Sequence, residues 1–188
     1  MTQEIKILQS DYGTAYPQIR YDLPANQKQD WLLIGRMCTR EVPADDAHLN
    51  AVQIHLDFLG IEADILSLTA AHLLSERAKA VLDNMHFKKR WFRWTVSRKP
   101  FYLLLVDSYC DLLDPKQSTF DYFDDGGIAG VAQIALKPKA KPNADIFKIP
   151  ELPMDIFCTA TAQDAIRAAG LIGFKFIDLG DLHNWQAW

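Results

Sequence analysis

Hydrophobic and polar residues alternate with a period of two in several short stretches of the chain. In Ala51–Leu59 (AVQIHLDFL), and again in Trp91–Val96, apolar residues occupy every second position. Because successive side chains of a β-strand point to opposite faces, this alternation predicts strands with one buried face. Phe101–Val106 (FYLLLV) is apolar throughout, which predicts a central strand covered on both faces. Further strands are predicted at Glu4–Leu8, Trp31–Cys38 and Gly130–Leu136.

A period near that of the α-helix first appears in Leu68–Leu82. Its leucine, alanine and valine residues recur along one stripe, and most charged residues lie outside that stripe. The helix has two alternative N-caps, Thr69 and Ser75, because either hydroxyl can accept a hydrogen bond from the free amides of a first turn. The polar pair Asp83 and Asn84 is expected to end it.

The segment from residue 145 to residue 179 shows the most regular succession of elements. Strands are predicted at Asp145–Ile149 and Asp155–Cys158, with a proline-framed turn between them. Thr161 and Asp164 are spaced as in a capping box, so a helix is expected to start at Thr161. Gly170 is suited to the left-handed position that ends a helix. The last predicted strand is Phe174–Leu179.

These elements predict an α+β fold with a mixed or mainly antiparallel sheet and two or three helices, arranged as one body or as two lobes. Asp111–Gly127 is rich in Asp and Gly and is predicted to be a loop, and Lys137–Asn143 a solvated connection. Residues 1–60 are expected to form an N-terminal strand and loop region. Residues 61–188 are expected to form an α+β region, and the two ranges are compatible with one continuous domain.

The composition is that of an ordinary globular protein. Of the 188 residues, 49% are apolar and 23% charged, and the formal net charge of −4 requires no highly charged partner. No apolar run is long enough for a membrane helix, and no secretory signal is evident, so a cytoplasmic location is predicted. Cys38, Cys110 and Cys158 are widely spaced in apolar surroundings, which favours buried free thiols in a reducing compartment.

An acidic run between Phe101 and Leu136 is the main candidate for a binding surface. This stretch contains six aspartates and only one basic residue, Lys116. Three interpretations compete: a solvated loop, a surface that meets a basic protein partner, or a site for a hard cation. The spacing does not match a calcium-binding loop, and no metal is predicted. The candidate partner-binding residues are Asp107, Asp111, Asp114, Asp121, Asp124 and Asp125.

A basic and aromatic run occupies residues 86–100. It contains six lysine or arginine residues and no acidic residue, with Phe and Trp residues interleaved. Cations neutralise phosphates and aromatic faces stack on bases, so this composition suits single-stranded nucleic acid. The alternation in Trp91–Val96 favours the other interpretation, in which aromatic residues fill the core and cations face water. The basic residues are Lys88, Lys89, Arg90, Arg93, Arg98 and Lys99.

Known catalytic motifs are missing from the sequence. Neither a nucleophile elbow nor a phosphate-binding loop or dinucleotide-binding fingerprint occurs. Histidines are not paired three or four residues apart, as zinc hydrolases require, and no cysteines are paired at the spacing of a structural zinc site. No cofactor is predicted, and nothing in the residues argues for an enzyme.

The order of elements from Leu74 to Leu179 resembles a family of bacterial immunity proteins for polymorphic toxins. This family was first described as a domain of unknown function, and many members are encoded beside type VI secretion effectors. The resemblance covers a little over half of the chain. It rests on four stretches: LLSERAKAVLD (73–83), FYLLLVDSYCDLLDPKQS (101–118), DIFKIPELPMDIFCT (145–159) and AIRAAGLIGFKFIDL (165–179).

The resemblance implies a protein that is not an enzyme and that binds a cognate toxin or effector stoichiometrically. For a toxin that acts on nucleic acid or nucleotides, the acidic run would fit a basic cleft as a surrogate for phosphate. The alternatives are a nucleic-acid-binding module that uses residues 86–100 and an enzyme with an unrecognised site.

Overall fold

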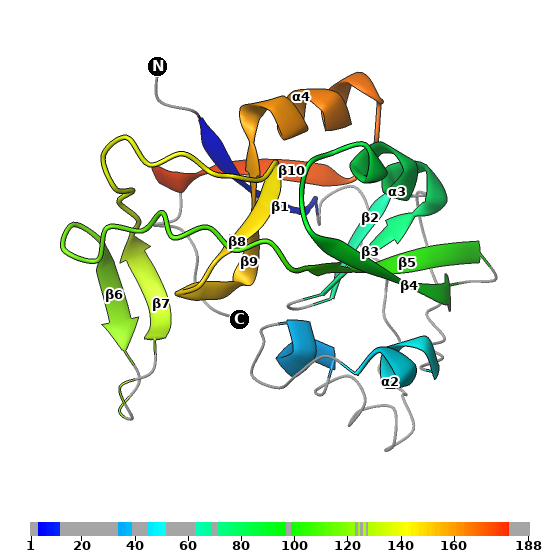
Figure 1. Ribbon diagram of the computed structural model, residues 1–188, viewed down its shortest axis with the longest axis horizontal. Coiled ribbons are helices and arrows are strands. Elements are labelled where there is room, and N and C mark those ends of the chain that lie inside the picture. The colour runs from blue at the N-terminus through cyan, green and yellow to red at the C-terminus, as the bar shows by residue number, and fades with distance from the viewer. Residues whose placement is uncertain are drawn as a thin grey trace.

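The computed structural model describes residues 4–11, 34–38, 45–51, 63–68, 71–96, 99–122, 124, 126 and 128–180. Two four-stranded sheets and one two-stranded sheet form the described part of the fold, and all their strand pairs are antiparallel (Figure 1). The predicted α+β class is confirmed. The sheets are linked by shared hydrophobic clusters, so the arrangement is set by packing between elements that are far apart in the sequence.

The first sheet has the strand order β2-β3-β5-β4. Its strands are β2 (Ile65–Leu68), β3 (Ala71–Ser75), β5 (Lys99–Val106) and β4 (Lys89–Val96). In β4, Phe92, Trp94 and Val96 are buried while the residues between them are exposed, as the alternation predicts. In β5, residues 103–106 are all buried, which confirms the predicted central strand covered on both faces.

The second sheet has the order β10-β1-β9-β8. Its strands are β10 (Phe174–Asp178), β1 (Ile5–Ser10), β9 (Leu152–Thr159) and β8 (Ile146–Ile149). All six residues of β1 are buried, because the strand lies between two others. A strand from the beginning of the chain therefore completes a sheet whose other strands come from its last quarter.

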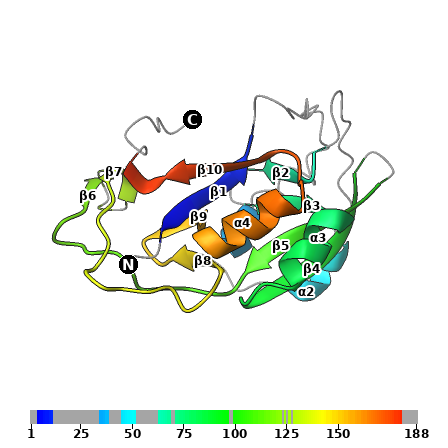
Figure 2. The ribbon, with the colours of Figure 1, turned by 90° about the horizontal axis from the view of Figure 1, so that it is seen from above.

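Both four-stranded sheets contain the same connection of strand, helix and strand. Helix α3 (Glu76–Asp83) starts directly after β3, and helix α4 (Ala160–Ala168) starts directly after β9. In each case the next strand returns to the same sheet two positions away, beside a strand that runs antiparallel to both. The two helices lie side by side over the sheets (Figure 2). Their buried apolar residues, Ala78, Leu82, Ala162 and Ile166, join one hydrophobic cluster.

Hydroxyl side chains cap both helices. The Ser75 Oγ accepts a hydrogen bond from the Ala78 amide at 3.1 Å, and the Thr159 Oγ1 accepts one from the Ala162 amide at 3.3 Å. Ser75 is one of the two caps predicted for the first helix. The predicted start at Thr161 is wrong, because the strand leads directly into the helix and Thr159, its last residue, already satisfies the first turn.

Gly170 ends α4 as predicted, with a positive φ of 62°. The Gly170 amide donates to the Arg167 carbonyl, and the Leu171 amide donates to the Ile166 carbonyl. This double pattern satisfies two carbonyls at the helix end. Gly173, three residues later, has φ of 87°, and a Cβ placed there would lie 3.0 Å from the Ala63 Cβ. The turn before β10 therefore depends on glycine for both conformation and space.

Each four-stranded sheet with its helix is called a unit below: the first sheet with α3, and the second sheet with α4. Asp64 joins these two units where the end of α4 meets the start of α3. The Ser75 Oγ donates to its Oδ1 at 2.6 Å, and the Ile172 amide donates to its Oδ2 at 2.8 Å. The Arg77 guanidinium lies 3.2 Å from the same carboxylate and also donates to the Gly170 carbonyl. One nearly buried carboxylate thus ties a helix cap of the first unit to the turn after the helix of the second.

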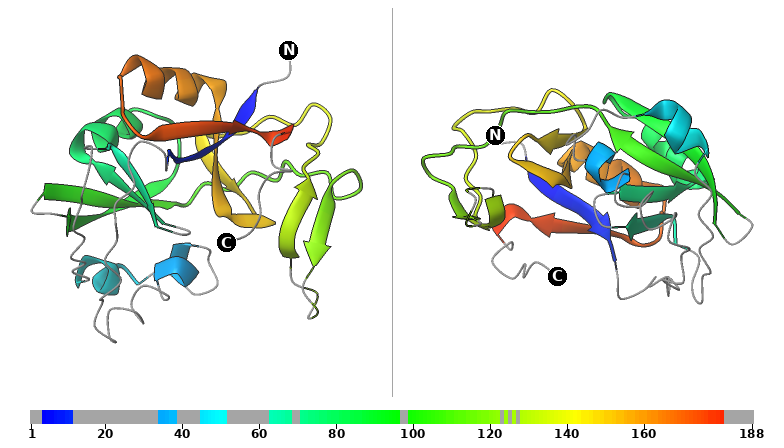
Figure 3. Two further views of the ribbon diagram at one scale, coloured as in Figure 1. Left: turned by 180° about the vertical axis from the view of Figure 1, so that it is seen from behind. Right: turned by 90° about the horizontal axis from the view of Figure 1, so that it is seen from below.

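The N-terminal segments cover the opposite face of the first sheet. Residues 34–38 are helical and precede α2 (Asp46–Ala51), and both lie below the sheet in Figure 1 and in the left view of Figure 3. Ile34, Met37 and Leu49 pack in one cluster with residues of β3, β4 and β5. The Trp94 Nε1 donates to the Leu49 carbonyl at 2.9 Å, which places α2 against β4.

Two sequence-based element predictions are wrong within the described residues. Residues 34–38 of the predicted strand Trp31–Cys38 are helical. Of the predicted strand Ala51–Leu59 only Ala51 is described, and it ends α2. Most of the first half of the predicted helix Leu68–Leu82 forms strand, because β3 finds partners on both edges. The remaining residues of these two strands lie outside the described residues. The division into residues 1–60 and 61–188 stays a prediction.

Candidate protein interface

A β-hairpin projects from the body of the molecule. It consists of β6 (Thr119–Tyr122) and β7 (Ile128–Gln133), which form a separate two-stranded sheet. In Figures 1 and 3 this hairpin stands at one end of the long axis, beside the second sheet and far from the first. The sequence predicted a loop over Asp111–Gly127. That prediction misses β6, whose short length and two register shifts leave little alternation to detect.

Hydrogen bonds fasten the base of the hairpin. The Ser118 Oγ accepts from the Ala135 amide at 3.0 Å and donates to the Ala135 carbonyl at 3.2 Å. The Asp114 amide donates to the same carbonyl at 2.8 Å, and the Lys137 amide donates to the Leu112 carbonyl at 2.8 Å. Two chain segments are therefore joined on both sides of the hairpin's start. This clamp gives a fixed direction to a two-stranded unit that would be marginal alone.

Two aromatic residues follow one face of β6 from base to tip. Phe120 is partly buried against the third hydrophobic cluster, which contains Leu112, Leu113 and Phe147. Tyr122 lies two residues further along and is 62% exposed. The ring centroids of Phe120 and Tyr122 are 6.2 Å apart, within the range of favourable aromatic pairs. Phe120 thus links the exposed tyrosine to the core.

The predicted acidic residues fall into two groups. Asp107 accepts two hydrogen bonds from Arg90, at 2.8 and 3.2 Å, and Asp111 pairs with Lys137 at 2.5 Å. Asp114 shapes a turn, since its Oδ1 accepts from the Lys116 amide at 3.0 Å. Asp121 and Asp124 are exposed on the hairpin, and no cation among the described residues pairs with them. Asp125 lies outside the described residues.

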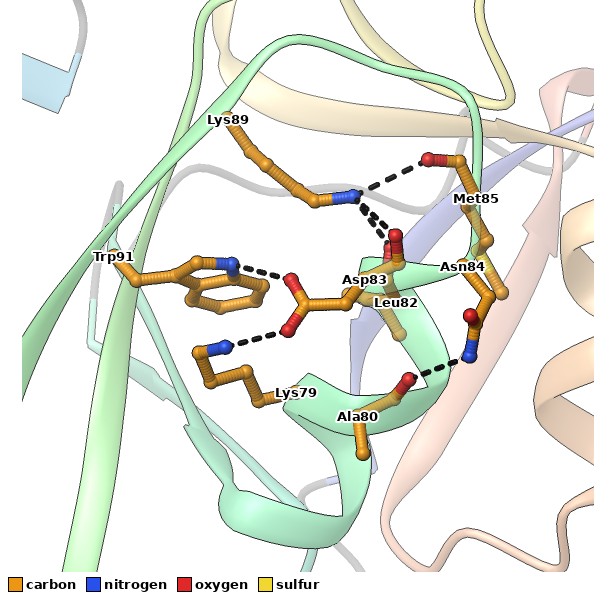
Figure 4. Close-up of polar contacts among 8 residues, drawn as sticks. All are labelled: Lys79, Ala80, Leu82, Asp83, Asn84, Met85, Lys89 and Trp91. Carbon is orange, nitrogen blue, oxygen red and sulfur yellow. Dashed lines mark hydrogen bonds and ion pairs between the residues drawn. The ribbon is translucent and has the colours of Figure 1, made fainter.

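Much of the basic and aromatic run has a structural role (Figure 4). The Lys89 Nζ donates to the carbonyls of Leu82, Asp83 and Met85, at 2.7, 3.3 and 3.2 Å, and so caps the end of α3. Burial lowers the pKa of this lysine. The Asp83 carboxylate accepts from the Trp91 Nε1 at 2.8 Å and pairs with Lys79. Burial alone would raise the pKa of Asp83, but these two donors together lower it.

The other members of the run divide between core and surface. Phe92 and Trp94 are buried, as the alternation predicts, and Arg90 pairs with Asp107 and Asp46. The hydrogen bonds that Arg90 donates to Asp107 raise the pKa of Arg90 above its usual value. The exposed cations among the described residues of this run are Lys88, Arg93 and Lys99, while Arg98 lies outside them. The nucleic-acid alternative therefore has only these few exposed cations for phosphate contacts among the described residues, and it stays a prediction.

A buried lysine was not anticipated from the sequence. The Lys148 Nζ donates to the Cys38 carbonyl and the Pro153 carbonyl, each at 2.7 Å, so it holds residues 34–38 against the second sheet. Burial, and secondly the Lys148 charge, lower the pKa of His72 to about 3. Burial raises the pKa of Asp155 to about 6, although the Lys148 charge opposes this shift. The KIP stretch around Lys148 carries no pattern that marks a buried cation.

The three cysteines are free and buried, which confirms the prediction. Burial raises the pKa of Cys38 to about 11 and that of Cys158 to about 12. A thiol with such a pKa carries almost no thiolate at neutral pH, so neither cysteine is activated as a nucleophile. Across the described ranges, no three histidine, cysteine or acidic side chains gather as metal ligands would. None of the helices described here has the length and apolar character needed to span a bilayer.

Comparison with known protein families assigns the chain to one of them. Residues 60–181 match the family model of the immunity protein family Imm11, which covers well over half of the chain. The chain belongs to this family, and the resemblance noted in the sequence is confirmed. The match includes helices α3 and α4, the first sheet and the β6–β7 hairpin, but it begins after β1 and α2. No curated protein matches the chain, so the assignment rests on the family model.

Proposed function

We propose that this protein neutralises a bacterial toxin by binding it stoichiometrically in the cytoplasm of the cell it protects. The observation that carries this proposal is the family match over residues 60–181. It is supported by the absence of catalytic motifs from the sequence and by the unreactive state of the buried cysteines. The toxin belongs to the polymorphic class, such as a type VI secretion effector, and the protein performs no chemical step on it.

The proposed contact residues are the aspartates of the acidic run, Asp107, Asp111, Asp114, Asp121, Asp124 and Asp125. An acidic surface accelerates encounter with a basic partner and fixes the orientation of the complex. A toxin that acts on nucleic acid or nucleotides needs a basic cleft for phosphate. We propose that carboxylates from this surface occupy such a cleft and exclude the substrate.

The test is a titration of toxin activity. The toxin encoded beside the gene for this chain is held at fixed concentration, and the purified protein is added in steps. Stoichiometric binding predicts a linear loss of activity that is complete at an equimolar ratio, together with a complex that survives gel filtration. In cells, coexpression is expected to restore growth. Complete inhibition at a small fraction of the toxin concentration would instead indicate an enzyme that modifies the toxin and would overturn the proposal.

A further inference from the structure

The β6–β7 hairpin has the mechanical properties of a preformed binding element. Its base is joined to the body by the reciprocal Ser118–Ala135 hydrogen bonds and by the Leu113–Leu136 bridge. Its strands have no partner in either four-stranded sheet of the described structure. A binding segment that already holds its bound conformation loses less conformational entropy on association than a flexible one. The hairpin is therefore suited to insertion into a partner.

Tyr122 is placed as the anchor of such an element. At 62%, it is the most exposed large apolar side chain among the described residues, and Phe120 supports it from the core side. Tyrosine combines a large contact area with few rotatable bonds and a polar hydroxyl, so it is enriched among the residues that dominate binding energy. Thr119 and Asp121 alternate with these two residues along β6, and both are exposed.

The charge of the hairpin specifies the chemistry of its partner. Residues 119–133 contain three aspartates and no lysine, arginine, histidine or glutamate. Asp121 and Asp124 are exposed and lack a cation partner within the described structure, whereas Asp107 and Asp111 are paired with Arg90 and Lys137. The paired carboxylates are already neutralised within the molecule. The two on the hairpin are available to lysine or arginine residues of another protein.

We infer that the β6–β7 hairpin is the part of this protein that enters the toxin, with Tyr122 in an apolar pocket and Asp121 and Asp124 against the basic rim of a cleft. This inference rests on the proposed function and narrows it, because it assigns the interface to one projecting element of the acidic surface. Asp107, Asp111 and Asp114 then act mainly within the molecule, where they hold the segments that support the hairpin.

The test compares two hairpin variants with two matched controls in the full chain. Tyr122→Ala removes the anchor, and Asp121→Lys with Asp124→Lys reverses the charge. Ile172→Ala removes another exposed apolar side chain, and Asp164→Lys reverses an exposed charge on α4. Affinity for the toxin encoded by the neighbouring gene is measured by calorimetry. Each hairpin variant is expected to bind at least about tenfold more weakly, and each control within about twofold of the unsubstituted protein.

Two further readouts make the result decisive. Thermal unfolding is expected to be unchanged in all four variants, since the substituted side chains are exposed. Gel filtration of the protein alone is expected to show no Tyr122-dependent self-association; a dimer that Tyr122→Ala dissociates would assign the hairpin to a second copy and overturn the inference. Unchanged toxin affinity in both hairpin variants would also overturn it, while leaving neutralisation by binding intact. If the unsubstituted protein neither binds nor protects, both proposals fail.

Discussion

At the scale of single residues, the environment created by the fold changes the chemistry of side chains that are ordinary in the sequence. His72 lies in β3 and is 4% exposed, and Lys148 is 1% exposed although it carries a charge. Lys148 is tolerated because two carbonyl groups accept hydrogen bonds from it. The histidine close to this charge is held neutral. A buried cation and a buried neutral histidine together make the interior sensitive to acid.

The histidine leads to a prediction on pH. Its pKa is about 3 in the folded protein, against 6.5 for an unperturbed group, so protonation favours the unfolded chain. The stability that neutral His72 contributes is fully present above pH 6.5, the pKa of this histidine in the unfolded chain. It is lost as the pH falls from 6.5 toward 3. Between about pH 7 and about pH 5 the loss amounts to about 2 kcal/mol.

The His72→Gln variant, studied by urea unfolding at both pH values, is expected to lack this loss. The exposed His86 serves as the control, and His86→Gln is expected to keep the pH dependence of the unsubstituted protein. Asp155, whose raised pKa of about 6 gives the opposite slope, is unchanged in both proteins and cancels in the comparison. Equal pH dependence in His72→Gln and in the unsubstituted protein would contradict the prediction.

At the scale of elements, the two halves of the fold repeat a strand that leads directly into a capped helix. Ser75 and Thr159 are both N-caps, but their surroundings differ. Ser75 also donates to Asp64, the carboxylate that binds the turn after α4. Thr159 forms only the cap among the side-chain hydrogen bonds found in the described structure. The first cap therefore also connects the two units.

This difference predicts unequal costs for two similar substitutions. Thr159→Ala removes one capping hydrogen bond and is expected to lower the free energy of unfolding by about 1 kcal/mol. Ser75→Ala removes the cap and also removes the hydrogen bond that Ser75 donates to the nearly buried Asp64 carboxylate, so a loss of about 2 kcal/mol is expected. Chemical denaturation at neutral pH measures both. Thr161→Ala, at an exposed position of α4, is the control, and equal effects at Ser75 and Thr159 would show that the Asp64 contact adds nothing.

At the scale of the whole molecule, long-range pairing makes the N-terminal strand essential to a sheet at the other end of the chain. β1 pairs with β9 through residues 5–8 and with β10 through residues 6–10. Ile7 is fully buried and Leu8 nearly so, each in a different cluster. The family match begins at residue 60 and omits this strand. The matched region thus lacks the strand that joins β9 to β10.

Removal of residues 1–11 is accordingly expected to abolish cooperative thermal unfolding, because β9 and β10 lose their common partner and two clusters are opened. A synthetic peptide of residues 1–11, added in excess, is expected to restore the transition by occupying the vacant position between the strands. The same peptide with Ile7→Asp and Leu8→Asp is the control and should not restore it. A cooperative transition in the shortened chain at the temperature of the full chain would refute the assignment of β1 as a required strand.

The sequence by itself determined the features that depend on neighbours in the chain. The burial of Phe92, Trp94 and Val96, the two-sided burial of β5, and the glycine that ends α4 all follow from local periodicity and local backbone preference. Local pattern was insufficient at residues 34–38 and at β3. A short apolar run suits a buried helix and a buried strand equally, and the available partners decide between them.

Only the tertiary structure decided how distant parts of the chain combine. It placed β1 between β9 and β10, buried Lys148 beneath residues 34–38, and separated the paired Asp107 and Asp111 from the exposed Asp121 and Asp124. The acidic run was visible in the sequence, but Tyr122 was not distinguished from other aromatic residues. The physical reason is that hydrogen bonds and ion pairs between remote residues form only after folding has brought those residues together. The local sequence pattern does not show which remote residues become neighbours.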